Sequence, residues 1–112
     1  MPALEAAVTR AHRNSIEQFL RERGIAANTI DLIGLHGQTV FHPPQRRITR
    51  QLGNGGEIAT RFGVPTVFRF RHADIAAGGE GAPLVPLYHQ ALGAELEKPL
   101  MILNLGGVGN VT

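Results

Sequence analysis

The stretch IDLIGLHGQTVFH, residues 30–42, decides the fold class of this 112-residue chain. Its first part, IDLIGLH (30–36), is short and almost continuously apolar, which predicts a strand covered on both faces. Its second part, QTVFH (38–42), alternates in polarity, and so does RITRQL (47–52). Because two prolines lie in the HPPQRR segment (42–47) that joins them, we expect a hairpin or meander there.

Helices are expected on both sides of these strands. Residues 2–24, PALEAAVTRAHRNSIEQFLRERG, repeat apolar side chains at steps of three and four, which predicts an amphipathic helix that ends at its glycine. GGEIATRFG (55–63) predicts a short helix of about two turns that also ends at a glycine. APLVPLYHQALG (82–93) predicts a further helix with Pro86 in its first turn.

Two more strands complete the predicted order. PTVFRF (65–70) is rich in β-branched and aromatic residues, and PLMILNLGG (99–107) predicts a last buried strand that runs into glycines. The strand opened by residues 110–112 has no visible partner, so we expect a chain truncated relative to its natural domain. The mixed order of helices and strands favours an α/β fold over an all-β or an all-helical one.

Composition excludes several classes of protein. Hydrophobic residues make up 43% and charged residues 18%, as in a soluble globular domain. No apolar run approaches the roughly 20 residues that span a bilayer, and the first residues do not resemble a signal peptide, so we expect a cytoplasmic protein with no membrane partner. The lack of cysteine excludes disulfides and thiolate metal sites. A net charge of +2 is too small to indicate a nucleic-acid partner.

HGQTVFH (36–42) follows the first predicted strand, and open α/β sheets bind ligands at the carboxyl ends of their strands. The polar side chains at its start suit the hydroxyls and amides of a sugar, and they belong to His36, Gln38 and Thr39. The residues alone leave open the alternative that these groups only satisfy the backbone of a tight turn.

Two glycine-rich turns can bring backbone N–H groups to an anion. LGNGGEIA (52–59) precedes a short helix, but it lacks the Lys and Ser/Thr of a P-loop. NLGGVGN (104–110) follows an apolar strand and can approach phosphates, but its spacing does not match the GxGxxG motif of dinucleotide-binding folds. For both turns a purely structural loop stays open as the alternative.

DIAAGGEGAPLVP (74–86) places one carboxylate, Asp74, before a run of small residues. An isolated Asp on a loop is usually a solvated charge or a helix cap. Here the alanines and glycines let a ligand approach the backbone closely, and the two prolines stiffen the exit. A carboxylate on such a loop can accept a proton from a water or hydroxyl group held against it.

Taken together, the motifs carry a resemblance that none of them carries alone. HGQTVFH, LGNGGEIA, FRFRHADIAAGGEGAPLVPLYH and ILNLGGVGNVT follow one another from residue 36 to residue 112. In this order and spacing the chain closely resembles the middle of the anhydro-N-acetylmuramic acid kinases, and the stretch 74–86 is the most specific part. The resemblance covers residues 31–112, and the first helix fits it too.

The resemblance implies a fold and a reaction. These kinases belong to the superfamily of sugar kinases, heat-shock ATPases and actin, which implies an actin-like α/β fold with a mixed sheet and flanking helices. Residues 1–98 would belong to the amino-terminal, sugar-kinase domain, and residues 99–112 would begin the nucleotide-side domain. Family members use ATP and magnesium to convert 1,6-anhydro-N-acetylmuramic acid and water into N-acetylmuramic acid 6-phosphate during cell-wall recycling.

The same resemblance implies roles for single residues. Asp74 would be the base that activates the attacking water. Part of the wall of the sugar site would be formed by His36, Gly37, Gln38 and Thr39. The last glycine turn would lie near the ATP phosphates, through Asn104, Gly106 and Gly107. No metal ligand is assigned within the chain.

The chain also departs from the pattern of this family. The amino-terminal phosphate loop of the GTSxDG type is missing, as is everything beyond Thr112, so we expect a fragment with little or no kinase activity by itself. Arg69 and Asn54 stand where Asp is common, and Glu80 stands where Gln is usual. The first two departures alter the local charge.

Two alternatives remain besides a kinase fragment. One is a noncatalytic module that holds a muropeptide sugar, which would show affinity without turnover. The other is a basic interaction domain, which a steep salt dependence of nucleic-acid binding would support. Such a domain would use Arg46, Arg47, Arg50, Arg69 and Arg71. Strand edges exposed by truncation also lead us to expect a homo-oligomer.

Overall fold

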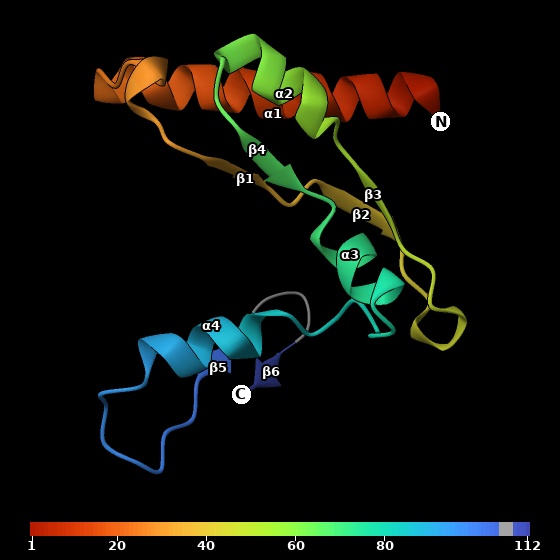
Figure 1. Cartoon of the computed structure of the whole chain (residues 1–112), viewed down its shortest axis with the longest axis vertical. Helices are drawn as coiled ribbons and strands as arrows, with labels where there is room; N and C mark the ends of the chain where they lie inside the picture. The colour runs from red at the N-terminus through yellow and green to blue at the C-terminus, as the bar shows by residue number, and fades with distance from the viewer. Residues whose placement is uncertain (106–108) are drawn as a thin grey trace. The chain divides into compact units, whose positions relative to one another are not determined.

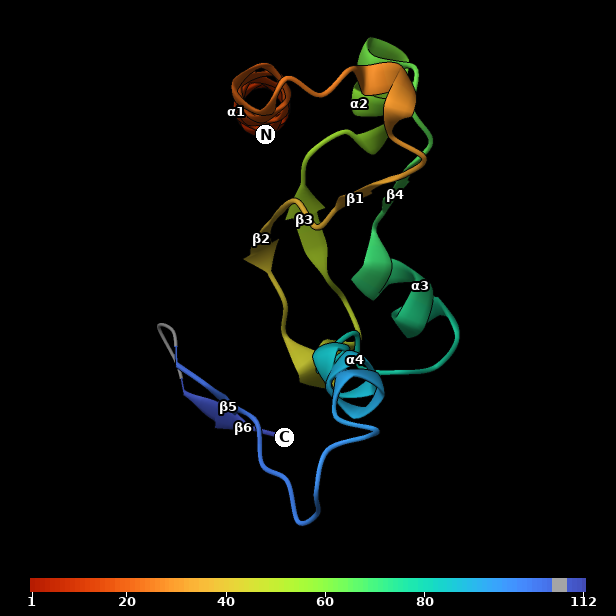
Figure 2. The same cartoon turned by 90° about the vertical axis from the view of Figure 1, so that its left-hand side faces the viewer.

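The structure, a computed structural model, describes residues 1–105 and 109–112. The described chain falls into two compact units, Met1–Gly81 and Ala82–Thr112. Figures 1 and 2 show the helices and strands of each unit.

The first unit begins with α1 (Pro2–Arg23), the long helix expected at the start of the chain. It ends at a glycine as predicted, because Gly24 adopts a left-handed conformation with φ 63° and its N–H donates to the Arg21 carbonyl at 3.2 Å. Arg21 and Arg23 in the last turn complement the negative end of the helix dipole. A short 3-10 turn, η1 (Ala27–Thr29), then leads towards the first strand.

β1 (Ile33–Leu35) pairs in parallel with β4 (Thr66–Phe68), and Figure 1 shows the two strands side by side. Parallel neighbours need a crossover connection, which here includes α2 (Gly55–Phe62). Leu35 is buried, but Leu32 just before the strand is 55% exposed. The prediction that this strand is covered on both faces is therefore wrong for the described residues, because a two-stranded sheet gives it few neighbours.

The hairpin predicted after β1 is confirmed. β2 (Gln38–Phe41) and β3 (Arg50–Leu52) pair in antiparallel fashion, with a shift in register between Thr39 and Phe41. The connection between them contains the 3-10 turn η2 (Pro44–Arg46). Proline suits this connection because it has no backbone N–H to donate to a ladder.

The apolar core of the first unit is small. It draws one buried side chain each from β1, β3, α2 and the approach to β4, namely Leu35, Leu52, Ile58 and Val64. α2 contacts β4 and buries Ile58 completely, as expected for a short amphipathic helix that lies against a sheet. Each such side chain contributes about 1.5–3 kcal/mol by leaving water. The core therefore gathers around α2 and the β1–β4 pair.

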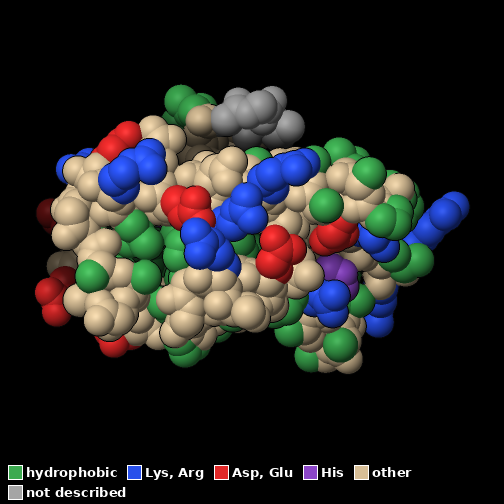
Figure 3. All heavy atoms as spheres, turned by 90° about the horizontal axis from the view of Figure 1, so that it is seen from above, with side chains coloured by type: hydrophobic (Ala, Val, Ile, Leu, Met, Phe, Trp, Pro, Cys, Tyr) green, Lys and Arg blue, Asp and Glu red, His purple; other side chains and the backbone are tan. Residues whose placement is uncertain are grey.

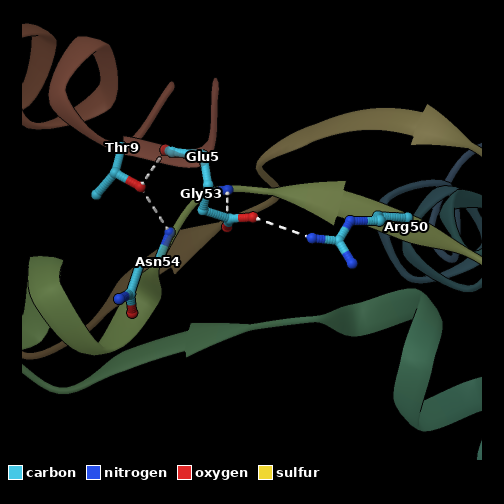
Figure 4. Close-up of polar contacts among 5 residues, drawn as sticks. All are labelled: Glu5, Thr9, Arg50, Gly53 and Asn54. Carbon is cyan, nitrogen blue, oxygen red and sulfur yellow. Dashed lines mark hydrogen bonds and ion pairs between the residues drawn. The ribbon is translucent and has the colours of Figure 1, made fainter. Parts of the chain in front are cut away.

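Polar contacts fasten α1 to the turn between β3 and α2 (Figure 4). Thr9, which is 1% exposed, donates to the Glu5 carbonyl at 2.8 Å and accepts from the Asn54 N–H at 3.0 Å. The Glu5 carboxylate accepts from the Gly53 N–H at 2.9 Å and lies 3.6 Å from the Arg50 guanidinium. These bonds pair backbone N–H groups that would be costly to bury without a partner.

The strand predicted over residues 65–70 ends early, at Phe68. Arg69 adopts a left-handed conformation with φ 60°, and α3 (Phe70–Ala76) begins directly after it. Because a left-handed residue cannot continue a strand, the chain turns there into the helix. The prediction that Asp74 lies on a loop is therefore wrong, since the residue belongs to the last turn of α3.

The second unit contains α4 (Val85–Leu92) and a small hairpin of β5 (Leu103–Asn104) and β6 (Asn110–Val111). Pro86 lies in the first turn of α4, as predicted. β5 and β6 pair in antiparallel fashion, so the prediction that the last strand has no partner is wrong. Leu103 is 61% exposed, so the predicted burial of β5 is also wrong, because a hairpin of two short strands covers little of either.

The described residues thus form a mixed α/β chain with small parallel and antiparallel sheets. The predicted α/β class is confirmed at this level. In the part of the chain that the structure describes, no helix is both long and apolar enough to cross a membrane.

Candidate functional site

Asp74 is held in place by the glycine loop that follows its helix. The residue is half-buried in the last turn of α3, and its Oδ2 atom accepts a hydrogen bond of 2.7 Å from the Gly81 N–H. The loop between them is compact, because the Gly79 N–H donates to the Asp74 carbonyl at 2.9 Å. The carboxylate therefore has a fixed direction instead of moving freely in solvent.

Two positions in this loop require glycine. A Cβ atom on Gly79 would overlap the carboxylate of Asp74. Gly81 has φ 76°, and a Cβ there would lie 3.0 Å from the Ile75 side chain. The small residues noticed in the sequence thus let the backbone close around Asp74.

Arg71 connects this loop to the second predicted stretch. One guanidinium nitrogen donates to the Gly81 carbonyl at 2.8 Å, and another lies 3.4 Å from Nε2 of His36. The other ring nitrogen of His36, Nδ1, lies 2.9 Å from the Gly37 carbonyl oxygen. The structure therefore brings His36 to the same side chain that contacts the Asp74 loop, although His36 and Asp74 lie far apart in the sequence.

The residues after His36 make contacts within the β2–β3 hairpin. Gly37 has φ 71°, and a Cβ on it would overlap the Leu52 carbonyl oxygen. The Gln38 amide donates to the Thr39 carbonyl at 3.2 Å, and the Thr39 hydroxyl accepts from the Gln51 amide at 3.3 Å. Gln38 is exposed and Thr39 is half-buried, so both retain polar groups at the surface of the hairpin.

Asn54 in the other glycine-rich turn caps α2. Its side-chain oxygen accepts from the N–H groups of Gly56 at 3.0 Å and Glu57 at 3.2 Å. This is the usual role of Asn at a helix N-cap. The structural alternative for this turn therefore has direct support.

Asn104 lies in β5 of the second unit, where it is exposed and pairs with Asn110. Gly106 and Gly107, the two glycines assigned with it, lie outside the described residues. Their predicted place near a nucleotide therefore stays a prediction.

The whole chain, residues 1–112, matches the model of a family described as anhydro-N-acetylmuramic acid kinase. The chain belongs to this family. Proteins named anhydro-N-acetylmuramic acid kinase from Paramagnetospirillum magneticum (strain ATCC 700264 / AMB-1) and Methylobacterium nodulans (strain LMG 21967 / CNCM I-2342 / ORS 2060) are 53% and 52% identical to it. The alignments cover 97% and 96% of this chain but 31% and 29% of the two relatives. A third relative of the same name, from Nitrobacter winogradskyi (strain ATCC 25391 / DSM 10237 / CIP 104748 / NCIMB 11846 / Nb-255), is 48% identical over 96% of the chain and 30% of its own length.

The resemblance noted in the sequence is thus confirmed, and the chain spans about 30% of the length of these kinases. The sequence motifs do not assign Arg71 to the site. Its spacing was the available signal, because residues three apart on a helix lie on the same side, and Arg71 precedes Asp74 by three. The signal holds only if residues 70–76 are helical, whereas the sequence predicts a loop around Asp74.

Proposed function

We propose that this chain is part of an ATP-dependent kinase that acts in peptidoglycan recycling. The reaction converts 1,6-anhydro-N-acetylmuramic acid and water into N-acetylmuramic acid 6-phosphate, with ATP as phosphoryl donor. Membership of the kinase family and the shared name of the relatives support this proposal. The fold would be the actin-like one, with residues 1–98 in the sugar-kinase domain and residues 99–112 at the start of the nucleotide-side domain.

Asp74 would be the base of this reaction. Water attacks the anomeric carbon, the bond from that carbon to O6 breaks, and O6 takes the γ-phosphoryl group of ATP, which leaves ADP. Asp74 accepts the proton that the water loses. The observation that carries the proposal is the held carboxylate: the Gly81 N–H fixes one oxygen at 2.7 Å, and Gly79 has no side chain to cover the group. A base fixed in direction can be matched to one attacking water.

The remaining predicted site residues complete the proposal. His36, Gly37, Gln38 and Thr39 would form part of the wall of the sugar site, for which the surface position of Gln38 is suitable. Asn104, Gly106 and Gly107 would lie near the ATP phosphates. Phosphoryl transfer depends mainly on positioning and on neutralising charge, so residues that orient either substrate should affect its rate.

Magnesium would supply neutralisation of the ATP phosphates when bound. Among the described residues no three His, Asp or Glu side chains come together to hold a metal ion. Magnesium that accompanies a nucleotide is usually held by the phosphates, by waters and by only one or two carboxylates, so no step of the proposed reaction is assigned to the ion.

Sugar binding tests the site without requiring turnover. We would titrate the isotope-labelled chain with 1,6-anhydro-N-acetylmuramic acid and follow backbone amide resonances by NMR. Amides of residues 36–39 and 74–81 should shift, and Asp74→Asn should alter the response. N-acetylmuramic acid, with the ring bridge already open, is the matched control ligand. Shifts confined to other parts of the chain would contradict the proposed site.

Turnover is tested separately in oxygen-18 water with ATP, magnesium and the anhydro sugar. Product analysis by mass spectrometry should show no labelled 6-phosphate from this chain alone, since it spans about 30% of its relatives. Labelled product that Asp74→Asn abolishes would establish the reaction and refute the expected inactivity. Labelled product that persists in Asp74→Asn would refute the role of Asp74.

A basic interaction domain has less support than sugar binding. Arg50 lies 3.6 Å from the Glu5 carboxylate, and Arg71 donates to the Gly81 carbonyl, so both are engaged within the chain. Figure 3 shows Lys and Arg side chains interspersed with Asp and Glu on the face seen from above. On this face, such mixed charge does not form the single-sign surface that binds a polyanion.

A further inference from the structure

We infer that Arg71 is a positioning residue, which holds Gly81 against Asp74 and fixes the tautomer of His36. This inference rests on the proposed role of Asp74 as the base. It adds to that role a physical reason why the carboxylate keeps its direction, and it gives His36 a positioning task in addition to its proposed place in the wall of the sugar site.

Arg71 and Asp74 each make a hydrogen bond to the backbone of Gly81, one to its carbonyl and one to its N–H. Asp74 Oδ2 accepts from the Gly81 N–H at 2.7 Å, and Arg71 donates to the Gly81 carbonyl at 2.8 Å. Arg71 and Asp74 can do this together because they are three residues apart on α3 and so lie on one side of the helix. A glycine has more backbone freedom than any other residue. Without these two hydrogen bonds, the backbone at Gly81 would be the most mobile point of the loop.

The contacts of His36, whose side chain is exposed, select one tautomer of the neutral ring. A guanidinium group has only donors, so Nε2 of His36 must accept at the 3.4 Å contact with Arg71. A carbonyl oxygen can only accept a hydrogen bond. Nδ1 lies 2.9 Å from the Gly37 carbonyl oxygen, so Nδ1 must carry the hydrogen. Both conditions are met by the neutral ring with its proton on Nδ1. In that state both ring nitrogens are engaged, and His36 supports Arg71 instead of offering a free N–H to a sugar.

The burial of Arg71 distinguishes it from a surface arginine. The residue is half-buried, and its Nε atom is fully buried with no hydrogen-bond partner among the described residues. Arg46 in η2, by contrast, is exposed. Charge-assisted hydrogen bonds in partly buried places are stronger than those at the open surface. The chain His36–Arg71–Gly81–Asp74 therefore links the two stretches that the sequence assigned to the sugar site.

The test uses two readings on the complete chain, without sugar or nucleotide. The first is the nitrogen-15 spectrum of the His36 ring, which distinguishes the Nδ1–H from the Nε2–H tautomer. The second is the hydrogen-exchange rate of the Gly81 amide. We would compare the wild type with Arg71→Met, which keeps the aliphatic length but no donor, with Arg71→Lys, and with the exposed control Arg46→Met.

The wild type should show the Nδ1–H tautomer and a protected Gly81 amide. Arg71→Met should lose the preference for that tautomer and exchange the Gly81 amide roughly tenfold faster, as expected for a lost hydrogen bond to a charged group. Arg71→Lys keeps one charged donor, so it should retain either the Nδ1–H tautomer of His36 or the slow exchange of the Gly81 amide. Arg46→Met should leave both the tautomer and the exchange rate as in the wild type.

Unchanged readings in a folded Arg71→Met would overturn the inference. If that variant fails to fold, the two measurements on the wild type are sufficient. An Nε2–H tautomer of His36 or an unprotected Gly81 amide in the wild type would also overturn the inference. Since neither reading involves the sugar, a failed sugar titration with both readings as expected would refute the proposed function and leave the positioning contacts intact.

Discussion

Gly37 illustrates how a single residue sets the backbone of the predicted sugar stretch. Its φ of 71° favours glycine, and a Cβ would overlap the carbonyl oxygen of Leu52 in the paired strand. Gly24 at the end of α1 has a similar φ of 63°, but a Cβ there would meet nothing within 4 Å. The two glycines therefore separate the cost of a left-handed backbone from the cost of a clash.

We predict that Gly37→Ala destabilises the chain more than Gly24→Ala does. Gly24→Ala should cost about 1–2 kcal/mol in the free energy of unfolding, from the left-handed backbone alone. Gly37→Ala should cost at least about 1 kcal/mol more, because the hairpin must shift to relieve the overlap. Urea denaturation followed by circular dichroism measures both. Equal losses would mean that the hairpin opens without resistance at this position.

The sequence could single out Asp74 as a site candidate through the run of small residues that follows it, and the family resemblance implied its role as the base. It could not predict the partners of that carboxylate. The bonds to Asp74 and Arg71 depend on how Gly81 folds back onto α3, and no local pattern encodes that return. His36 was predicted from its place after a strand, yet the contact of its Nε2 atom with Arg71 depends on a helix 35 residues away.

At the scale of elements, Thr9 joins α1 to the rest of the first unit. Its hydroxyl donates to the carbonyl four residues earlier and accepts from the Asn54 N–H, and it is 1% exposed. Thr60 in α2 makes the same kind of intrahelical bond, to the Gly56 carbonyl at 3.0 Å, but it is exposed. The comparison of Thr9→Val with Thr60→Val therefore isolates the bond between elements.

We predict that Thr9→Val lowers the free energy of unfolding by about 1–3 kcal/mol, because the Asn54 N–H is left without its acceptor. Thr60→Val should cost less than about 0.5 kcal/mol, as for most exposed substitutions. Thermal and urea unfolding give both values. A Thr9→Val protein as stable as Thr60→Val would show that water replaces the lost hydroxyl at no cost.

Asn54 offers a second prediction at this scale, because it caps α2 with bonds to two backbone N–H groups. Asn54→Ala should destabilise the chain by about 1 kcal/mol. Asn54→Asp should stay within about 0.5 kcal/mol of the wild type, since both residues are good N-caps. Asn28→Ala, at an exposed position in η1, is the control. A loss in Asn54→Asp equal to that in Asn54→Ala would contradict the capping role.

The elements that the sequence predicted well are those with their own end signals. α1 and α2 both end at left-handed glycines, and the hairpin turns at its prolines. α3 was missed because it has seven residues and no glycine or cap before it, only the left-handed Arg69. A helix this short takes its stability from tertiary contacts, which a local pattern does not contain.

At the scale of the whole molecule, burial was the least predictable property. The apolar runs before β1 and in β5 were expected to be covered, yet Leu32 is 55% and Leu103 61% exposed. An apolar run indicates that a strand is suited to burial, but the neighbours that bury it belong to the tertiary structure. The charge of the chain, by contrast, follows from composition alone.

The last prediction concerns the difference between the two units in local stability. The first unit, Met1–Gly81, contains the buried apolar core around Leu52 and Ile58. In the described part of the second unit, Ala82–Thr112, Gly93 is the one buried residue. A segment of this size with so little burial is expected to open frequently.

Hydrogen exchange on the complete chain should therefore show amides of α2, β1 and β4 protected, and amides of α4, β5 and β6 exchanging close to the rates of an unfolded chain. The experiment would be repeated over a range of protein concentrations, with sedimentation measured on the same samples. Protection of the second unit that rises with concentration would mean that a second copy covers its exposed apolar side chains, as expected for a homo-oligomer. Protection equal to that of the first unit at every concentration would refute the prediction, because burial within the monomer would then be far greater than its exposed fractions indicate.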